Sequence, residues 1–156
     1  MPDPIRKTMT KSKPRRLGKR PPKHNFVLNP YVDVRFSRCP KCEAKTKVRK
    51  LPLFIHVDPM YPVALNKTGR YCPDCDLLIV HRDDLEEILL QMFPNRDPEA
   101  FRDQYLVMGT VERKAYRASL KSPKTIPEML EHVHDFEAVW TVEYRPAGWY
   151  RDDSKT

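Results

Sequence analysis

Glycine is scarce in this chain, and several catalytic motifs are missing with it. Only four of the 156 residues are glycine, and none of them cluster, so the sequence holds no glycine-rich loop that would cradle a phosphate. It also lacks the G-x-S-x-G turn of serine hydrolases and the H-E-x-x-H pattern of zinc proteases. These absences predict a protein that is not an enzyme and has no small-molecule substrate.

Long apolar runs are missing as well. The longest, Leu77 to Val80 and Tyr105 to Met108, are far too short to cross a bilayer, and the N-terminus lacks the apolar core of a signal peptide. We therefore expect a cytoplasmic protein with no membrane partner. Thiols stay reduced in that compartment, so the cysteines are free to bind metal.

Cysteine is scarce as well, and its placement is the most informative feature of the chain. All four cysteines fall in two pairs, Cys39-Pro40-Lys41-Cys42 and Cys72-Pro73-Asp74-Cys75, separated by 29 residues. A C-x2-C turn lets two thiolates face one ion, and two such turns supply a closed tetrahedron. Disulfides or unrelated thiols are the alternative, but nothing marks the chain as secreted. Cys39, Cys42, Cys72 and Cys75 are therefore predicted to bind a structural metal.

The two C-P-x-C turns, with strand-like stretches between and after them, resemble the zinc-ribbon and rubredoxin-like superfamily over about residues 34–82. The resemblance implies a small antiparallel β ribbon around one metal ion. It implies no particular process, because the superfamily includes transcription, ribosomal, redox and purely structural modules. Within the ribbon we expect a solvent-facing strand around residues 45–49 and a buried strand over residues 51–57, with Pro52 at a bulge or edge. Turns are expected at Asp58-Pro59 and at residues 66–69.

Two residues and the local charge bear on whether the bound metal is zinc or iron. Glycine usually follows the second cysteine of each pair in these families, in a left-handed backbone conformation. Here those positions hold Glu43 and Asp76, so we expect slightly distorted metal-binding turns. The loop is also basic, whereas rubredoxin-like carriers are usually acidic. We favour Zn²⁺ over iron on ligand softness and on this basic surface, and keep a rubredoxin-like iron electron carrier as an alternative.

Positive charge is concentrated near the N-terminus. Residues 1–25 hold nine Lys or Arg and one acidic residue, which accounts for the whole net charge of +8. The segment has few large apolar residues, so residues 1–30 are predicted to be a disordered basic tail. Such a tail binds nucleic-acid phosphates nonspecifically, or is only a solubilising extension or a targeting leader.

The ribbon adds further basic residues, and aromatic residues lie among them. Together with the tail they form the predicted contacts to nucleic acid: Arg15, Arg16, Lys19, Arg20, Lys41, Lys45, Lys47, Arg49 and Lys50. The interleaved aromatics suit stacking on single-stranded bases, but equally suit the ribbon's small core: Tyr31, Phe36, Phe54, Tyr61 and Tyr71.

Residues 83–156 are more acidic, with ten basic and fifteen acidic residues, and their pattern is mainly helical. Asp83 is expected to cap a helix that Pro94 ends, and Asp97-Pro98 to start a short helix that buries Phe101. Strands are expected over residues 105–111 and 139–144.

A helix is also expected over residues 112–120, and a capping box from Thr125 to Glu128 precedes another whose apolar residues, as far as Phe136, face inward. The predicted fold class is α+β. A four-cysteine ribbon over residues 31–82 is followed by a helix-rich α/β region over 83–156 that packs on it.

Several histidines are candidate ligands or catalysts. His132-Val133-His134-Asp135 offers two imidazoles, which would point apart on a helix but together on a strand. We favour hydrogen-bonding histidines there. His56 and His81 are expected to be partly buried side chains rather than donors to the cysteine sulfurs or a substitute metal ligand.

Three functions from different classes follow. The favoured one is a non-enzymatic zinc-ribbon protein that binds nucleic acid or a ribonucleoprotein through its basic tail and ribbon. The second is a structural or protein-interaction module, in which zinc holds a scaffold for the acidic C-terminal half. The third is the rubredoxin-like electron carrier.

Overall fold

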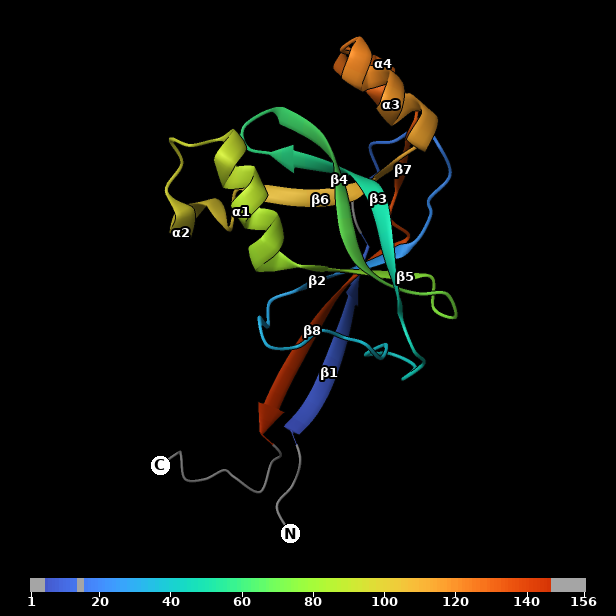
Figure 1. The fold of residues 1–156 in the computed structure, drawn as a ribbon, viewed down its shortest axis with the longest axis vertical. Helices are drawn as coiled ribbons and strands as arrows, with labels where there is room; N and C mark the ends of the chain where they lie inside the picture. The colour runs from blue at the N-terminus through green and yellow to red at the C-terminus, as the bar shows by residue number, and fades with distance from the viewer. Residues whose placement is uncertain (1–4, 14–15, 147–156) are drawn as a thin grey trace.

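The computed structural model describes residues 5–13 and 16–146 (Figure 1). Its elements, in chain order, are β1 (Ile5–Ser12), β2 (Asn25–Asn29), β3 (Lys47–Val57), β4 (Tyr61–Cys72), β5 (Leu77–His81), α1 (Arg82–Met92), α2 (Pro98–Phe101), β6 (Tyr105–Val111), α3 (Arg113–Lys121), α4 (Ile126–Leu130), β7 (Val133–Asp135) and β8 (Ala138–Pro146).

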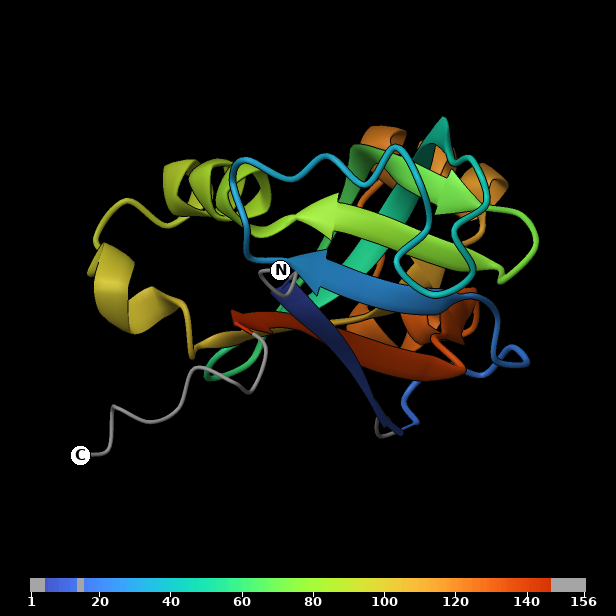
Figure 2. The ribbon, with the colours of Figure 1, turned by 90° about the horizontal axis from the view of Figure 1, so that it is seen from below.

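All these strands join one mixed sheet in the order β1-β8-β2-β5-β4-β3-β6-β7. Neighbours are antiparallel, except that β2 runs parallel to both β5 and β8. The long loop between β2 and β3 runs beside β2 and β5 (Figure 2). The predicted α+β class is thus borne out as a mixed sheet with a few helices, and strands from all three predicted segments share that sheet.

The structure differs from the predicted disordered tail over residues 1–30. β1 pairs with β8 along all eight of its residues, and β2 lies in the interior of the sheet. Between them, the backbone N–H groups of Arg20 and Lys23 donate to the carbonyls of Val133 and Asp135 on β7. An exposed strand edge supplies backbone partners to a segment of almost any composition, so few apolar residues are needed to order this one.

The main core lies between α1 and the central strands. Leu85 and Leu89 of α1 are fully buried against residues of β3, β4, β5 and β6, and Phe26 stacks on Phe136 with ring centroids 4.6 Å apart. Two smaller apolar clusters flank this core. One surrounds two of the cysteines, and the other lies where α3 and α4 meet the sheet.

Several local predictions are confirmed. β5 and β6 form where apolar runs indicated strands, α1 ends before Pro94, and the Asp97 side chain accepts a hydrogen bond from the Ala100 N–H at the start of α2. The Thr125 capping box forms, with both of its reciprocal hydrogen bonds. The Asp58-Pro59 turn, with a cis peptide bond, joins β3 to β4.

Three predictions were wrong. Residues 66–69 lie inside β4 rather than in a turn: Gly69 is required there because a β-carbon would lie 2.4 Å from the Ile79 carbonyl oxygen of β5. Asp83 does not cap α1: the N-cap residue is His81, which makes no side-chain capping hydrogen bond, and Asp83 lies in the first turn of the helix. The helix after Thr125 ends at Leu130, because the following residues pair with β6 as strand β7.

Within residues 5–13 and 16–146, no helix combines the length and the apolar composition needed to span a membrane.

Gly109 on β6 provides a test of this strand arrangement. A β-carbon there would lie 2.1 Å from the His134 carbonyl oxygen on β7, so Gly109→Ala should lower the free energy of unfolding by about 2 kcal/mol or more. Ser122→Thr, which adds one methyl group at an exposed position, is the control. Equal urea midpoints for Gly109→Ala and the wild-type protein would contradict the pairing of β6 with β7.

Candidate metal centre

The structure brings the four cysteine sulfur atoms together. Cys39 and Cys42 lie in the loop before β3, while Cys72 ends β4 and Cys75 lies in the turn before β5. All four sulfurs lie within 4.8 Å of one another, with 3.9 Å between Cys39 and Cys75 and 3.5 Å between Cys42 and Cys72. A tetrahedron of sulfurs about 2.3 Å from a central ion has edges of about 3.8 Å. The four thiols are free, so the cluster suits a metal ion and the disulfide alternative is wrong.

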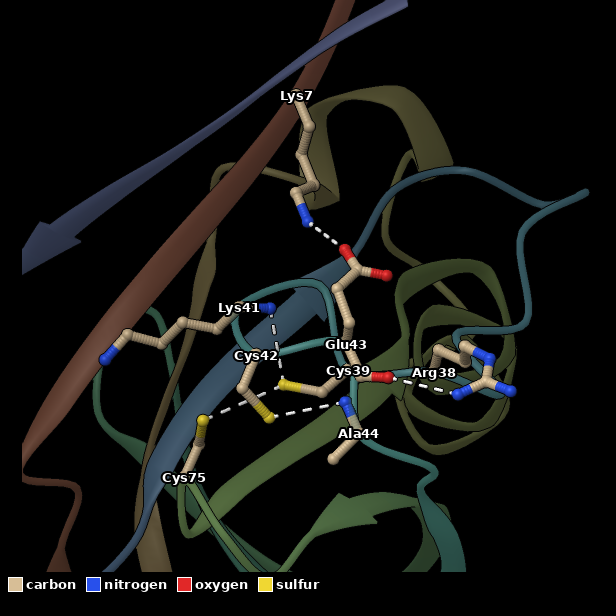
Figure 3. Close-up of polar contacts among 8 residues, drawn as sticks. All are labelled: Lys7, Arg38, Cys39, Lys41, Cys42, Glu43, Ala44 and Cys75. Carbon is tan, nitrogen blue, oxygen red and sulfur yellow. Dashed lines mark hydrogen bonds and ion pairs between the residues drawn. The ribbon is translucent and has the colours of Figure 1, made fainter.

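In the first cysteine turn, which holds Cys39 and Cys42, backbone N–H groups donate hydrogen bonds to the sulfur atoms (Figure 3). The N–H of Lys41 donates to Cys39 Sγ at 3.3 Å, and the N–H of Ala44 donates to Cys42 Sγ at 3.5 Å. Glu43, at the position where glycine is usual, has a φ of 68°, and Asp76 in the second turn has a φ of 51°. Both residues therefore take the left-handed conformation, which costs a non-glycine residue about 1–2 kcal/mol.

A network of backbone and side-chain contacts fixes the first turn to its surroundings. The Cys39 N–H donates to the Ala44 carbonyl at 2.8 Å, and the Arg38 guanidinium donates to the Glu43 carbonyl at 3.3 Å. The Glu43 carboxylate lies 3.0 Å from the Lys7 ammonium on β1 (Figure 3). The N-terminal strand thus reaches the metal-binding turn directly.

The second turn is held by residues at the start of β2. The Asp76 carboxylate accepts a hydrogen bond from the Tyr71 hydroxyl at 2.6 Å and lies 2.5 Å from His24 Nδ1. The Asn25 side chain donates to the Cys75 carbonyl at 3.2 Å. Sequence reasoning missed His24 and Asn25, because neither belongs to a recognisable motif.

Burial and hydrogen bonding set the protonation of the Asp76 network. Burial lowers the pKa of His24, against the opposing effect of Asp76. Burial also disfavours the Asp76 carboxylate, but hydrogen bonds from Tyr71 and His24 outweigh it and hold the pKa of Asp76 below its usual value. Burial and the bond to Asp76 raise the pKa of Tyr71 to about 12, so the tyrosine remains a donor at neutral pH.

The thiols themselves sit in unequal environments. Cys39 and Cys72 are fully buried beside Val27, Phe36 and Leu77, whereas Cys42 is exposed. Burial raises the pKa values of Cys72 and Cys75, while the N–H of Ala44 lowers the pKa of Cys42.

Because a metal binds thiolates, an ion entering this site must displace protons from the buried thiols. Four protein ligands complete a tetrahedron and leave no position for a substrate, which is the arrangement of a structural site. Zinc and iron both accept four thiolates in this geometry.

Of the predicted nucleic-acid residues of the ribbon, Lys41 and Lys45 belong to the loop that carries the first cysteine pair, and the other three lie on β3. Lys41 is placed with its ammonium 4.5 Å from the centre of the Trp140 ring on β8, and Arg49 lies 4.5 Å from the centre of the Tyr71 ring. Lys45, Lys47 and Lys50 are exposed, and none has a side-chain hydrogen bond or ion pair within the described part of the chain.

The predicted residues of the tail lie elsewhere. Arg15 falls outside the described residues. Arg16 and Lys19 are exposed, and the Lys19 N–H donates to the Leu130 carbonyl of α4. Arg20 Nε lies 3.3 Å from the Glu112 carboxylate beside β7. Lys19 and Arg20 therefore lie beside α4 and β7 rather than around the cysteines, unlike Lys7.

The histidines behave as hydrogen-bonding residues. His132 Nδ1 lies 2.8 Å from a Glu112 carboxylate oxygen, and His134 Nδ1 lies 2.8 Å from the Pro21 carbonyl. His81 contacts Asn29, and His56 contacts Asp58. Among residues 5–13 and 16–146, the cysteine tetrad is the one group of three or more potential ligands whose ligand atoms converge.

Comparisons of the chain with models of protein families, with curated proteins and with solved structures find no match.

Loss of one ligand tests the structural role of the metal. Cys75→Ser should unfold the ribbon, and chelation of the wild-type protein should lower its melting temperature strongly, because structural zinc contributes on the order of 10 kcal/mol in comparable small sites. Ser37→Ala, an exposed change in the same loop, is the control for circular dichroism melting. A melting temperature that chelation leaves unchanged would contradict a structural metal.

The left-handed residue of the first turn provides a second test. Glu43→Gly should stabilise the metal-loaded protein by up to about 1 kcal/mol, because glycine removes the left-handed penalty at this φ of 68°. Glu43→Ala loses the same contact with Lys7 but keeps a β-carbon, so it isolates the backbone effect. If Glu43→Gly melts no higher than Glu43→Ala, backbone strain at this position is not significant.

Proposed function

We propose that this protein is a non-enzymatic zinc-ribbon protein, with structural Zn²⁺ held by four cysteines, that binds nucleic acid or a ribonucleoprotein through its N-terminal basic segment and ribbon. The supporting observation is a set of exposed basic side chains with no acidic partner within the described residues: Arg16, Lys19, Lys45, Lys47 and Lys50. Exposed, unpaired cations are available to displace counterions from nucleic-acid phosphates.

The charge of the ribbon supports a polyanionic ligand even with metal bound. Residues 34–82 carry ten Lys or Arg against four Asp or Glu. Four thiolates around Zn²⁺ formally add −2, which leaves the ribbon with an excess of about +4. The N-terminal segment, with its own +8, approaches the same sheet through β1 and through residues 16–23.

Two alternatives each have one observation in their favour. Met60, Tyr61 and Met92 are large exposed apolar residues at the β3–β4 turn and the end of α1, which suits a protein-interaction module. The left-handed residues and N–H to sulfur bonds suit a rubredoxin-like iron centre equally well. The basic surroundings favour the nucleic-acid proposal over both.

Neutralising the ribbon cations in the full chain tests the proposal. Deleting residues 1–25 would remove the strand that pairs with β8, so substitution is the cleaner change. The variant Lys45→Gln/Lys47→Gln/Lys50→Gln should bind labelled oligonucleotides more weakly than wild type, and its salt slope should be lower by about 2–3 over roughly 50–200 mM KCl.

The matched control is Lys45→Arg/Lys47→Arg/Lys50→Arg, which keeps the charge and should keep the affinity. Fluorescence anisotropy provides the measurement. Failure of the wild-type chain to bind RNA or DNA at low salt would overturn the proposal.

A further inference from the structure

The positive charges of helix α3 destabilise that helix. Arg113, Lys114, Arg117 and Lys121 lie within it, and no acidic residue occurs from position 113 to 127. Arg113, Arg117 and Lys121 follow at four-residue intervals on one face, where like charges repel. Arg113 and Lys114 also occupy the first turn, where the positive end of the helix dipole disfavours cations.

Little within the helix offsets these costs beyond Lys121, whose charge suits the dipole in the last turn. The N-cap residue, Glu112, makes no capping hydrogen bond, because its carboxylate is engaged by His132. None of the residues of α3 is fully buried. A helix whose charges lower its own stability, with little compensation from capping or burial, is expected at a functional surface.

Two contacts fix α3 against the β3–β4 hairpin. The Tyr116 hydroxyl accepts a hydrogen bond from the Asn66 N–H at 3.3 Å, and the Arg113 guanidinium donates to the Lys50 carbonyl at 2.8 Å. Phe54 packs in the same cluster as Tyr116, and Lys50 precedes Phe54 by four residues on the same strand. Alternate residues of a strand share a face, so the Lys50 side chain lies on the face of the sheet that α3 covers.

A groove with two arginines in its lining continues this face toward the ribbon. Thr68, which is paired with Lys50, lines a cavity of about 300 Å³ together with Arg35 and Arg70. The guanidinium of Arg70 is oriented by two hydrogen bonds to Thr46, at 3.1 and 3.3 Å. One acidic residue, Asp84, also lines the groove.

The aromatic residues are not placed for stacking on this face. No Phe, Tyr or Trp side chain lines the groove, its one aromatic ring is the His81 imidazole, and the Tyr116 hydroxyl is engaged by β4. Phe36, Phe54 and Tyr71, which the sequence offered as stacking platforms, are buried. Recognition of single strands relies on exposed aromatic rings, so this face favours contact with phosphates over contact with unpaired bases.

We infer that the α3 face, defined as Arg35, Lys50, Arg70, Arg113, Arg117 and Lys121, binds the phosphate backbone of a nucleic-acid duplex without reading its sequence. This inference rests on the proposed function and specifies its ligand. α3 carries no Asn or Gln that would pair with base edges, and its regularly spaced cations suit backbone contact.

The double variant Arg117→Gln/Lys121→Gln tests the inference in the full chain. Arg113 is left in place because it bonds the Lys50 carbonyl. The control, Gln91→Glu/Asn95→Asp, makes the same change of net charge at exposed positions in and just after α1, on the other side of the molecule in Figure 1. Circular dichroism verifies that both variants are folded.

The probes are labelled RNA duplexes, DNA duplexes and single strands of one length. For Arg117→Gln/Lys121→Gln, the Kd for duplex should rise at least about tenfold and the salt slope should fall by about 2, while the control stays near wild type. Arg117→Lys/Lys121→Arg should retain affinity. The duplex that wild type binds more tightly identifies the preferred form.

Two outcomes would overturn the inference and leave ribbon and tail binding in place: unchanged duplex affinity in Arg117→Gln/Lys121→Gln, or tighter wild-type binding to single strands than to duplexes. If the wild-type chain binds no oligonucleotide at all, the proposed function itself fails.

Discussion

Convergence of four cysteine sulfurs on one point, in an arrangement that could hold a metal ion, is the constraint on which this structure depends. The two cysteine pairs lie at opposite ends of the β3–β4 hairpin segment, and they meet because the hairpin brings Lys47 at the start of β3 opposite Tyr71 near the end of β4. Each pair also needs a left-handed residue directly after it, here Glu43 and Asp76, so that the chain can turn around the sulfurs. Without an ion, buried thiols and strained turns would offer little to offset their cost.

The N-terminal segment participates in the metal centre rather than trailing from it. Lys7 on β1 contacts the first metal-binding turn, and His24 and Asn25 hold the second. Trp140 of β8, the strand that pairs with β1, lies beneath Lys41. Metal binding and ordering of the basic segment should therefore be coupled, and the basic side chains are presented on a framework.

Sequence patterns predicted the parts of the fold that local chemistry determines. The cysteine pairs specified the tetrad, and the apolar runs of β5 and β6 specified strands. The left-handed backbone at Glu43 and Asp76 also agrees with the family resemblance. The ribbon details beyond the tetrad remain a matter of resemblance.

The errors occurred where a partner strand, rather than local sequence, decides the structure. β1 has a composition typical of disorder but pairs with β8, and residues 66–69 have turn residues but lie between β3 and β5. The cations of α3 were overlooked for a different reason: averaging over residues 83–156 gave an acidic region and concealed fifteen residues without an acid. A shorter window would have revealed them.

The net charge of the ribbon depends on which metal ion the four cysteines hold. The proposed zinc, held by four thiolates, would lower the positive charge of the ribbon and still leave it positive. The most direct test is the metal-to-protein ratio of the purified chain, determined by elemental analysis. The account predicts one zinc per chain. A folded protein without metal, or one that contains iron instead, would contradict it.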